Sequence, residues 1–173
     1  ILTRRLVYLV LSLPDLLLGR KLRTVILCYH SISTNGWIHS VTEQQFQKQI
    51  LYLARFYKIV PLSGIFDYSY PVAAITFDDG YADIVSVAPF LQKLGIRPTV
   101  FILSDPAHAN RRELDNDSRL LNAAEIARLH KIGWEIGCHS ATHPDFTTLS
   151  PFQTAKEVKH SKKTLEKQFK IPI

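Results

Sequence analysis

The chain has 173 residues, of which 46% are apolar and 21% are charged, and its formal net charge is +6. This length and composition are those of one globular domain with its own core, and no repeat or low-complexity segment interrupts the sequence. Residues 1–24 carry five Lys or Arg against one Asp, and residues 150–173 carry six against two Glu, which leaves −2 for the middle. Because the middle is slightly acidic, the charge pattern argues against a nucleic-acid groove, and we expect no nucleic-acid partner.

The first 23 residues form a hydrophobic and basic segment that we separate from a domain at residues 24–173. Two arginines precede an apolar stretch at residues 6–18, which Pro14 and Asp15 interrupt. The stretch is shorter than the roughly 18 residues that a spanning helix needs, and no small-residue cleavage site follows it. Three interpretations stay open: the remnant of a membrane anchor or signal, an interfacial amphipathic helix, or a helix packed on the domain. The first two predict membrane association through this segment.

Short apolar runs alternate with helix-length periodic stretches along the domain. The apolar runs predict five strands, at residues 24–29, 58–62, 72–77, 98–103 and 134–138, and the first of them is expected to be buried. Capping boxes predict helices that begin at Thr42, Asn122 and Ser150, and the first of them is expected to run to Tyr57. Strands that alternate with helices indicate parallel pairing, so the sequence predicts an α/β fold.

Three features beside these elements leave alternatives open. Residues 81–94 predict a helical stretch, which Pro89 either kinks or divides by starting a second helix. Residues 104–121 are polar and predict a long loop. Cys28 and Cys138 each follow an apolar run, which favours buried free thiols and leaves a disulfide between them as the alternative.

Residues of metal-binding and titratable types follow three of the predicted strands. His30 follows the first strand, Asp78 and Asp79 follow the third, and His139 and His143 follow the fifth. In parallel α/β folds, functional sites lie at the carboxyl ends of the strands. The coincidence therefore predicts a site at this edge of the sheet.

The Asp78-Asp79-Gly80 motif alone is a good turn sequence, because Asp caps its own backbone and Gly accepts a positive φ angle. Side chains of adjacent strand residues point to opposite faces. Both carboxylates can therefore reach one site only if the chain bends, and Gly80 permits such a bend.

His139 and His143 have the i, i+4 spacing of metal ligands on a helical turn or a tight loop. With seven histidines in the chain, such a pair also arises by chance. Pro144 pushes the preceding residue away from the helical region, so a loop is the better placement for the pair.

Taken together, the two motifs predict more than either does alone. Two His and one Asp make a three-ligand set with an open position, which is typical of a catalytic zinc site. The remaining Asp is then placed to act as general base towards water. This set of residues predicts hydrolysis of an amide or an ester.

The segment ITFDDG at residues 75–80 and the block GWEIGCHSATHPDFTTLS at residues 133–150 together resemble the polysaccharide deacetylase family, which has the NodB-homology domain. The segments LCYHSI near the start and KLGIRPTVFIL after the first motif are similar to the same family. The resemblance covers about residues 25–173, and the order of the TFDDG and H-S-x-x-H-P motifs makes it specific.

The resemblance implies a role for each motif residue. Asp78 is the expected catalytic base, and the expected metal ligands are Asp79, His139 and His143. The implied fold is a distorted (β/α) barrel with fewer than eight strands. The implied reaction removes acetyl groups from an N-acetylated polysaccharide, although some members act on O-acetyl esters. The implied cofactor is a divalent metal, usually Zn²⁺, and the implied location is the cell envelope or another extracytoplasmic site.

The sequence departs from the family towards its C-terminus. The family's Arg-x-Pro segment, aspartate-tryptophan segment and Leu-x-His, which supplies the general acid, do not occur in these 173 residues. Residues 170–173 stand where the Arg-x-Pro strand is expected to begin. We therefore expect a partial barrel truncated at its C-terminus, in a fragment that retains the metal half-site but lacks the general acid.

Two residues are weaker candidates for substrate binding. His30 either faces the site or is a core histidine, and Tyr81, next to Gly80, is a candidate for the pocket wall. Trp37 is a candidate for stacking on a sugar, whereas Trp134 is expected in the core. Four other histidines are expected at the surface: His39, His108, His130 and His160.

Two other functions stay open beside the deacetylase. One is a non-catalytic carbohydrate- or membrane-associated module that retains the metal site. The other is a metal-dependent hydrolase of a different acyl substrate. The polymer is also left open among chitin oligomers, peptidoglycan, poly-N-acetylglucosamine and acetylated xylan.

Overall fold

A parallel five-stranded sheet organises the part of the chain that the computed structural model describes, which is residues 23–110, 112, 114–115 and 118–173. Its strands are β1 (Val25–Tyr29), β4 (Lys58–Ile59), β5 (Val72–Phe77), β6 (Thr99–Ile102) and β7 (Glu135–Cys138). The order is β1-β5-β6-β7, and β4 pairs with the start of β5. The sheet does not close within these residues, so the α/β prediction is confirmed in the form of a partial (β/α) barrel.

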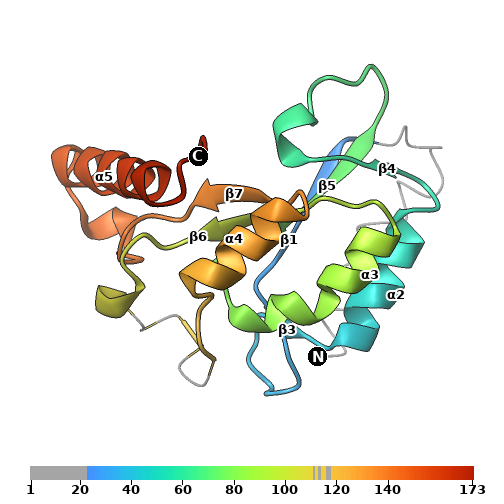
Figure 1. The fold of residues 1–173 in the computed structure, drawn as a ribbon, viewed down its shortest axis with the longest axis horizontal. Coiled ribbons are helices and arrows are strands. Elements are labelled where there is room, and N and C mark those ends of the chain that lie inside the picture. The colour runs from blue at the N-terminus through green and yellow to red at the C-terminus, as the bar shows by residue number, and fades with distance from the viewer. Residues whose placement is uncertain (1–22, 111, 113, 116–117) are drawn as a thin grey trace.

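Three helices cover one face of the sheet, and a fourth lies beside β7 (Figure 1). They are α2 (Glu43–Leu53), α3 (Ala88–Lys93), α4 (Ala123–Lys131) and α5 (Pro151–Phe169). The smaller elements are β2 (Ser31–Ile32), β3 (Ser40–Val41), η1 (Leu62–Gly64), η2 (Ala82–Val87), η3 (Pro106–His108) and η4 (Phe146–Thr148). The predicted segment 1–23 lies outside the described residues except for its last residue. None of the helices described is both long and apolar enough to cross a membrane.

The predicted helix starts at Thr42, Asn122 and Ser150 are confirmed, but the predicted end of the first helix is not. Thr42, Asn122 and Ser150 each cap a helix through a capping box, in which the cap side chain and the N3 side chain satisfy each other's backbone N–H. The first of these helices ends at Leu53 rather than at residue 57. Pro89 begins α3 within its first turn, so the stretch divides into η2 and α3.

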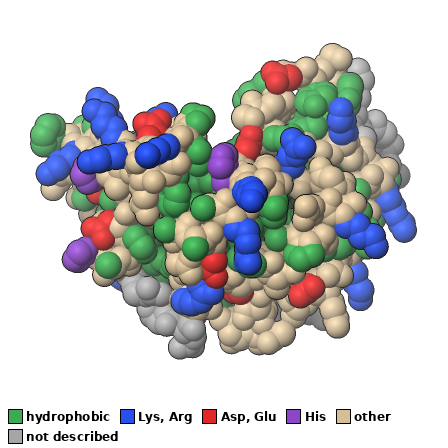
Figure 2. All heavy atoms as spheres, viewed as in Figure 1, with side chains coloured by type: hydrophobic (Ala, Val, Ile, Leu, Met, Phe, Trp, Pro, Cys, Tyr) green, Lys and Arg blue, Asp and Glu red, His purple; other side chains and the backbone are tan. Residues whose placement is uncertain are grey.

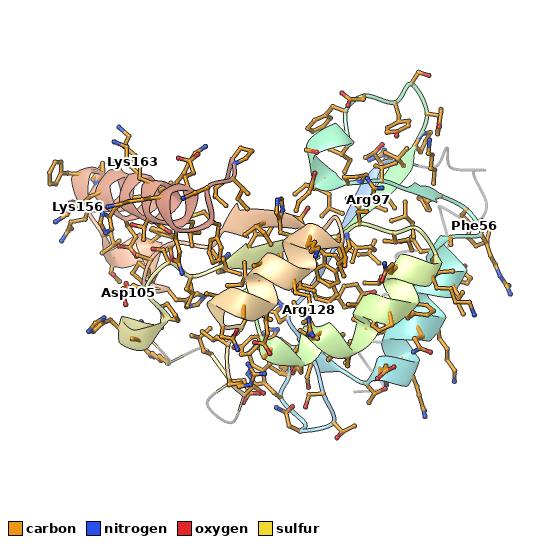
Figure 3. The ribbon with its side chains drawn as sticks, viewed as in Figure 1. Phe56, Arg97, Asp105, Arg128, Lys156 and Lys163 are labelled. Carbon is orange, nitrogen blue, oxygen red and sulfur yellow. The ribbon has the colours of Figure 1, made fainter. Side chains whose placement is uncertain are left out.

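The core lies between the sheet and the helices. Ala73, Ile75 and Phe77 of β5 face this core, and Trp134 stacks on Phe77 with ring centroids 5.4 Å apart. Trp134 is only 2% exposed, which confirms its predicted place in the core. Long charged side chains take the outside, and Figure 3 shows Lys156 and Lys163 of α5 pointing away from the body of the molecule.

The other face of the sheet is partly open. Val72 and Ala74 pack there in a small cluster, and a hollow of about 520 Å³ lies nearby, bounded by Phe101 and Ile173 among others. Figure 2 shows apolar side chains in the cleft between α5 and the segment around β4. The prediction that β1 is buried is therefore only half right: its alternate residues, including Ile26, are exposed, because β1 pairs only with β5 among the described residues.

Candidate metal centre and active site

Asp78, Asp79 and Gly80 form the turn that leaves the carboxyl end of β5. Asp79 and Gly80 both have positive φ angles, 66° and 73°, and the Gly80 N–H donates to the Asp78 carbonyl at 2.8 Å. The predicted bend is therefore present, and it begins at Asp79 itself, one residue before Gly80. A Cβ atom at Gly80 would lie 2.8 Å from Ile102 Cγ2, so the turn requires glycine on both conformational and steric grounds.

His139 and His143 lie on the loop that follows β7. The loop is left-handed at two non-glycine residues, since φ is 69° at Ser140 and 53° at His143. Pro144 disfavours the right-handed helical conformation at His143, as the sequence predicts. The loop, and not a helix, therefore brings the two imidazoles together, with ring centroids 5.5 Å apart.

Asp79, His139 and His143 converge on one point. Asp79 Oδ1 lies 3.2 Å from His139 Nε2 and 3.4 Å from His143 Nε2, and one ligand atom from each residue lies within 4.8 Å of the others. Asp79 is only 3% exposed, and its Oδ1 has no hydrogen bond among the described residues. A buried carboxylate oxygen without a partner is costly. A cation between these N, N and O donors would satisfy it, so the residues fit a zinc-type site.

The electrostatics of His139 follow from the same contact. Burial alone lowers the pKa of the His139 imidazole, but the Asp79 carboxylate outweighs burial and raises that pKa above its ordinary value. The more distant Asp78 carboxylate adds to the same upward shift.

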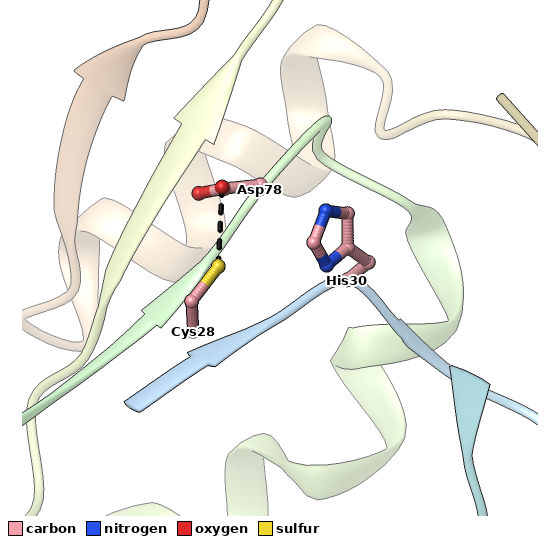
Figure 4. A group of neighbouring side chains, drawn as sticks. All are labelled: Cys28, His30 and Asp78. Atoms are coloured by element: carbon pink, nitrogen blue, oxygen red, sulfur yellow. Dashed lines mark hydrogen bonds between the residues drawn. The ribbon is translucent and has the colours of Figure 1, made fainter. Parts of the chain in front are cut away.

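A second group of donors lies beside the first. Cys28 Sγ donates a hydrogen bond to Asp78 Oδ2 at 3.1 Å, and Figure 4 shows the His30 ring next to both. One ligand atom from each of the three residues lies within 4.8 Å of the others. Asp78 is therefore not one of the three donors of the Asp79 group. It lies next to them and accepts a hydrogen bond from the Cys28 thiol.

The thiol and the imidazole of this second group are both electrically neutral at neutral pH. Partial burial, helped by the Asp78 carboxylate, raises the pKa of Cys28 to about 11, although the residue as a whole is exposed. Burial lowers the pKa of His30, which the two aspartates oppose only in part. A neutral thiol is a hydrogen-bond donor, which is the role that Cys28 Sγ plays towards Asp78 Oδ2.

Helix α5 holds the histidine loop in place from behind. Glu157 Oε1 accepts hydrogen bonds from the Ala141 N–H at 2.9 Å and from the Thr142 N–H at 2.8 Å. Ser161 Oγ donates to the Ser140 carbonyl at 2.6 Å. These bonds fix the left-handed loop, so Glu157 positions the two imidazoles without touching the site.

The structure places some of the remaining candidates for substrate binding at the site and others away from it. His30 is brought to the site, whereas Tyr81 is fully buried and its hydroxyl accepts from the Asp115 N–H at 2.8 Å. Tyr81 therefore does not form the pocket surface that we expected. Trp37 is partly exposed and lies near His30, with ring centroids 5.9 Å apart. The four histidines expected at the surface are all exposed.

Sequence reasoning missed two contributors, Cys28 and Glu157. Both cysteines are free, and Cys28 is exposed rather than buried, so the favoured free thiols are confirmed but the burial predicted for Cys28 is wrong. The available signal was spacing: Cys28 lies on β1 two residues before His30, which directly follows the strand, and residues two apart in extended chain share a face. Glu157 gave no signal, because its partners are backbone groups of a loop in another segment.

Comparison with known proteins gives the family. The model of the family described as polysaccharide deacetylase matches residues 67–172. YxkH of Bacillus subtilis (strain 168), provisionally named a polysaccharide deacetylase, is 27% identical over 153 residues, which are 83% of this chain and 52% of that protein. The bifunctional xylanase/deacetylase of Pseudobutyrivibrio xylanivorans is 29% identical over 97 residues, which are 56% of this chain and 14% of that protein. The chain thus spans about half or less of the length of these relatives.

Solved structures share the fold. The Streptococcus pyogenes deacetylase PplD, in complex with acetate, has a TM-score of 0.68 at 22% identity, and the match covers 87% of this chain and 71% of that one. IcaB from Ammonifex degensii has a TM-score of 0.71 at 18% identity, with 88% and 72% covered. With the fold and more than half of its length matched, the chain belongs to the polysaccharide deacetylase family.

Proposed function

We propose that this chain carries the metal-binding half-site and the base of a zinc-dependent enzyme that removes acetyl groups from an N-acetylated polysaccharide. The observation that carries the proposal is the buried Asp79 Oδ1, which faces two imidazoles and has no hydrogen bond among the described residues. A structural carboxylate would have a partner at this depth. A carboxylate that serves as a metal ligand would be left in this state.

The roles divide between two adjacent aspartates. Asp79, His139 and His143 would hold the cation, which when bound supplies a Lewis acid that polarises the acetyl carbonyl and acidifies water. Asp78 then accepts a proton from the water that attacks the acetyl carbon. The carbon–nitrogen bond breaks, acetate leaves, and the departing amine takes the proton that Asp78 has accepted, which returns Asp78 to its starting state. Asp78 suits this role because the Cys28 thiol holds one of its oxygens in a fixed orientation.

The surroundings of the site support a sugar substrate. Trp37, His39 and His30 form an aromatic group, in which the Trp37 and His39 rings lie 5.0 Å apart and the His30 and His39 rings 5.1 Å apart. Aromatic faces beside a polar group suit a pyranose ring, which has apolar C–H faces and polar edges. Acetylated polysaccharides of this kind belong to the cell envelope, so we also propose an extracytoplasmic location.

The test of this proposal is acetate release by the zinc-loaded chain from N-acetylglucosamine oligomers, with acetylated xylan as the ester substrate. Asp78→Asn should lower the rate by about 10²–10⁴-fold, which is the usual contribution of a general base, while zinc binding is retained. The matched control is Asp67→Asn, which changes an exposed aspartate outside the site.

Three results would contradict the proposal in different ways. Unchanged turnover in Asp78→Asn would remove Asp78 as the base. Zinc and oligosaccharide binding without any acetate release would favour the non-catalytic module. Faster release from xylan than from the oligomers would assign the site to O-acetyl groups.

A further inference from the structure

The second donor group has the composition of a cation site of its own. Cys28, His30 and Asp78 offer one sulfur, one nitrogen and one oxygen, all within 4.8 Å of one another. Figure 4 shows the three side chains pointing towards one another from β1 and from the end of β5. Among the described residues no Lys or Arg forms an ion pair with Asp78, so no cationic side chain takes the place of a metal ion there. We infer that these three residues bind a second divalent cation beside the Asp79 group.

Ordinary strand geometry produces this cluster. Cys28 and His30 are two residues apart on β1 and its continuation, so both side chains point to the same face. The parallel register places Cys28 opposite Thr76 on β5. Asp78 is the next residue after Thr76 on that face, and it therefore lies between Cys28 and His30. No backbone strain is needed, so the three donors are in position before any ion arrives.

The donors determine which cations bind. A thiolate with an imidazole selects zinc and softer ions such as Cd²⁺, whereas Mg²⁺ and Ca²⁺ prefer sites made of oxygen alone. The thiol must release its proton to solvent when the sulfur binds. Because the thiol proton is held in a hydrogen bond to Asp78 Oδ2, only an ion with a strong affinity for sulfur can displace that proton. The neutral His30 ring needs no such displacement when its free nitrogen binds.

Occupation of this site has a consequence for catalysis, which rests on the proposed function. An ion bound to Asp78 takes the carboxylate oxygen that would accept the proton of water. Hydrolysis should therefore stop when zinc or cadmium is present in excess over the first site. Cys28 would make the enzyme sensitive to thiophilic ions although the thiol takes no part in the reaction itself.

The test is the stoichiometry of cation binding to the metal-free chain. Zn²⁺ is titrated calorimetrically, and Cd²⁺ is followed by the ultraviolet sulfur-to-cadmium charge-transfer band. The wild-type chain should bind two equivalents and develop the band. Cys28→Ser should keep one equivalent and lose the band. His30→Gln should lower the affinity for the second cation by roughly 10–100-fold or more, because loss of a hydrogen-bond partner of a ligand alone already has an effect of that size.

Matched variants separate the two sites and the two thiols. Cys138→Ser changes the other thiol, which contacts Ser161 Oγ at 2.8 Å, and should keep both equivalents and the band. His139→Ala should lose the first equivalent and keep the band, even if no acetate is ever released. A band that persists in Cys28→Ser, or a single equivalent without a band in the wild type, would overturn the second site. Failure of His139→Ala to lose an equivalent would instead overturn the first.

Discussion

The two donor groups lie side by side, but their backbones differ in kind. The Asp79 group depends on left-handed backbone at Asp79, Ser140 and His143, whereas Cys28 and His30 follow a regular edge strand. Left-handed non-glycine residues cost about 1–3 kcal/mol each and persist only where the surroundings hold them. The Asp79 group is therefore built at the expense of stability, whereas Cys28 and His30 reach their positions through strand geometry.

The supports of the Asp79 group form two layers. The first consists of the Gly80 turn and the bonds from Glu157 to the histidine loop. The second is the segment at residues 119–121, where the Leu121 N–H donates to the Gly80 carbonyl at 2.8 Å and the Arg119 carbonyl accepts from the Ala82 N–H at 3.0 Å. Substitutions in these layers should disturb the Asp79 group more than the Cys28 group, because Cys28 and His30 do not depend on either layer.

The largest effect is expected from Gly80→Ala. The new Cβ would combine the strain of a φ angle of 73° with a 2.8 Å approach to Ile102 Cγ2. We expect a loss of about 3 kcal/mol in the free energy of unfolding and loss of the first zinc equivalent, with the cadmium–thiolate band retained. Urea unfolding and calorimetry measure the two effects.

Gly95→Ala is the matched control for this change. Gly95 has a similar φ angle of 70°, but no atom lies within 4 Å of its added Cβ. The Gly95→Ala variant should lose only about 1 kcal/mol in the free energy of unfolding, because backbone strain is its only cost. It should bind as much zinc as the wild-type chain. An equal loss in the free energy of unfolding in Gly80→Ala and Gly95→Ala would show that the Ile102 contact does not contribute.

A smaller effect is expected from Glu157→Ala. The Ala141 and Thr142 N–H groups would lose their acceptor, which costs about 2 kcal/mol for partly buried donors. Because the loop would loosen, zinc affinity at the first site should fall by roughly 10–100-fold. Glu157→Gln keeps an acceptor oxygen and should restore most of the affinity; if it binds zinc as poorly as the alanine variant, charge and not loop support is the cause.

The smallest effect is expected in the second layer, where Arg119 forms an ion pair with Glu125 and their side-chain atoms approach to 2.6 Å. The hydrogen bond from Arg119, with help from Asn122, lowers the pKa of Glu125 from 4.5 to about 2. The folded state thus binds fewer protons, so the contribution is complete above pH 4.5 and disappears as the pH falls towards about 2. Glu125→Gln should cost about 0.5–1 kcal/mol at pH 7, since the pair is near the surface.

Unfolding at pH 7 and at pH 3 measures the difference in the free energy of unfolding between the wild-type chain and Glu125→Gln, and this difference should be smaller at pH 3. Glu166→Gln is the control, because Glu166 pairs with Lys162 at 3.7 Å on the outside of α5 and should show little change at either pH. A constant difference across the two pH values would mean that Glu125 acts through its capping bonds and not through its charge.

The sequence predicts the part of the site that depends on local pattern. The buried run of β5, the capping boxes and the histidines after β7 are readable because each reports on its own neighbours along the chain. The exposure of Cys28 depends on which strands flank β1, and the burial of Tyr81 depends on the segment around Asp115. The role of Glu157 depends on a loop that folds back onto α5. These are contacts between distant segments, which one sequence does not encode in a local pattern.

The parallel register also has a consequence for how the protein forms. Cys28 and Asp78 meet across 50 residues of chain, and Asp79 meets the histidines only after β6 and β7 have joined the sheet. Loops of this length close slowly, because their entropy is lost before any contact rewards it. The Asp79 group therefore cannot be complete until the histidine loop has docked, whereas Cys28, His30 and Asp78 come together once β1 and β5 pair. If both groups bind cations as we propose, the Cys28 group would be the first to be ready for one, and a chain that stalls before β7 joins would lack only the Asp79 site.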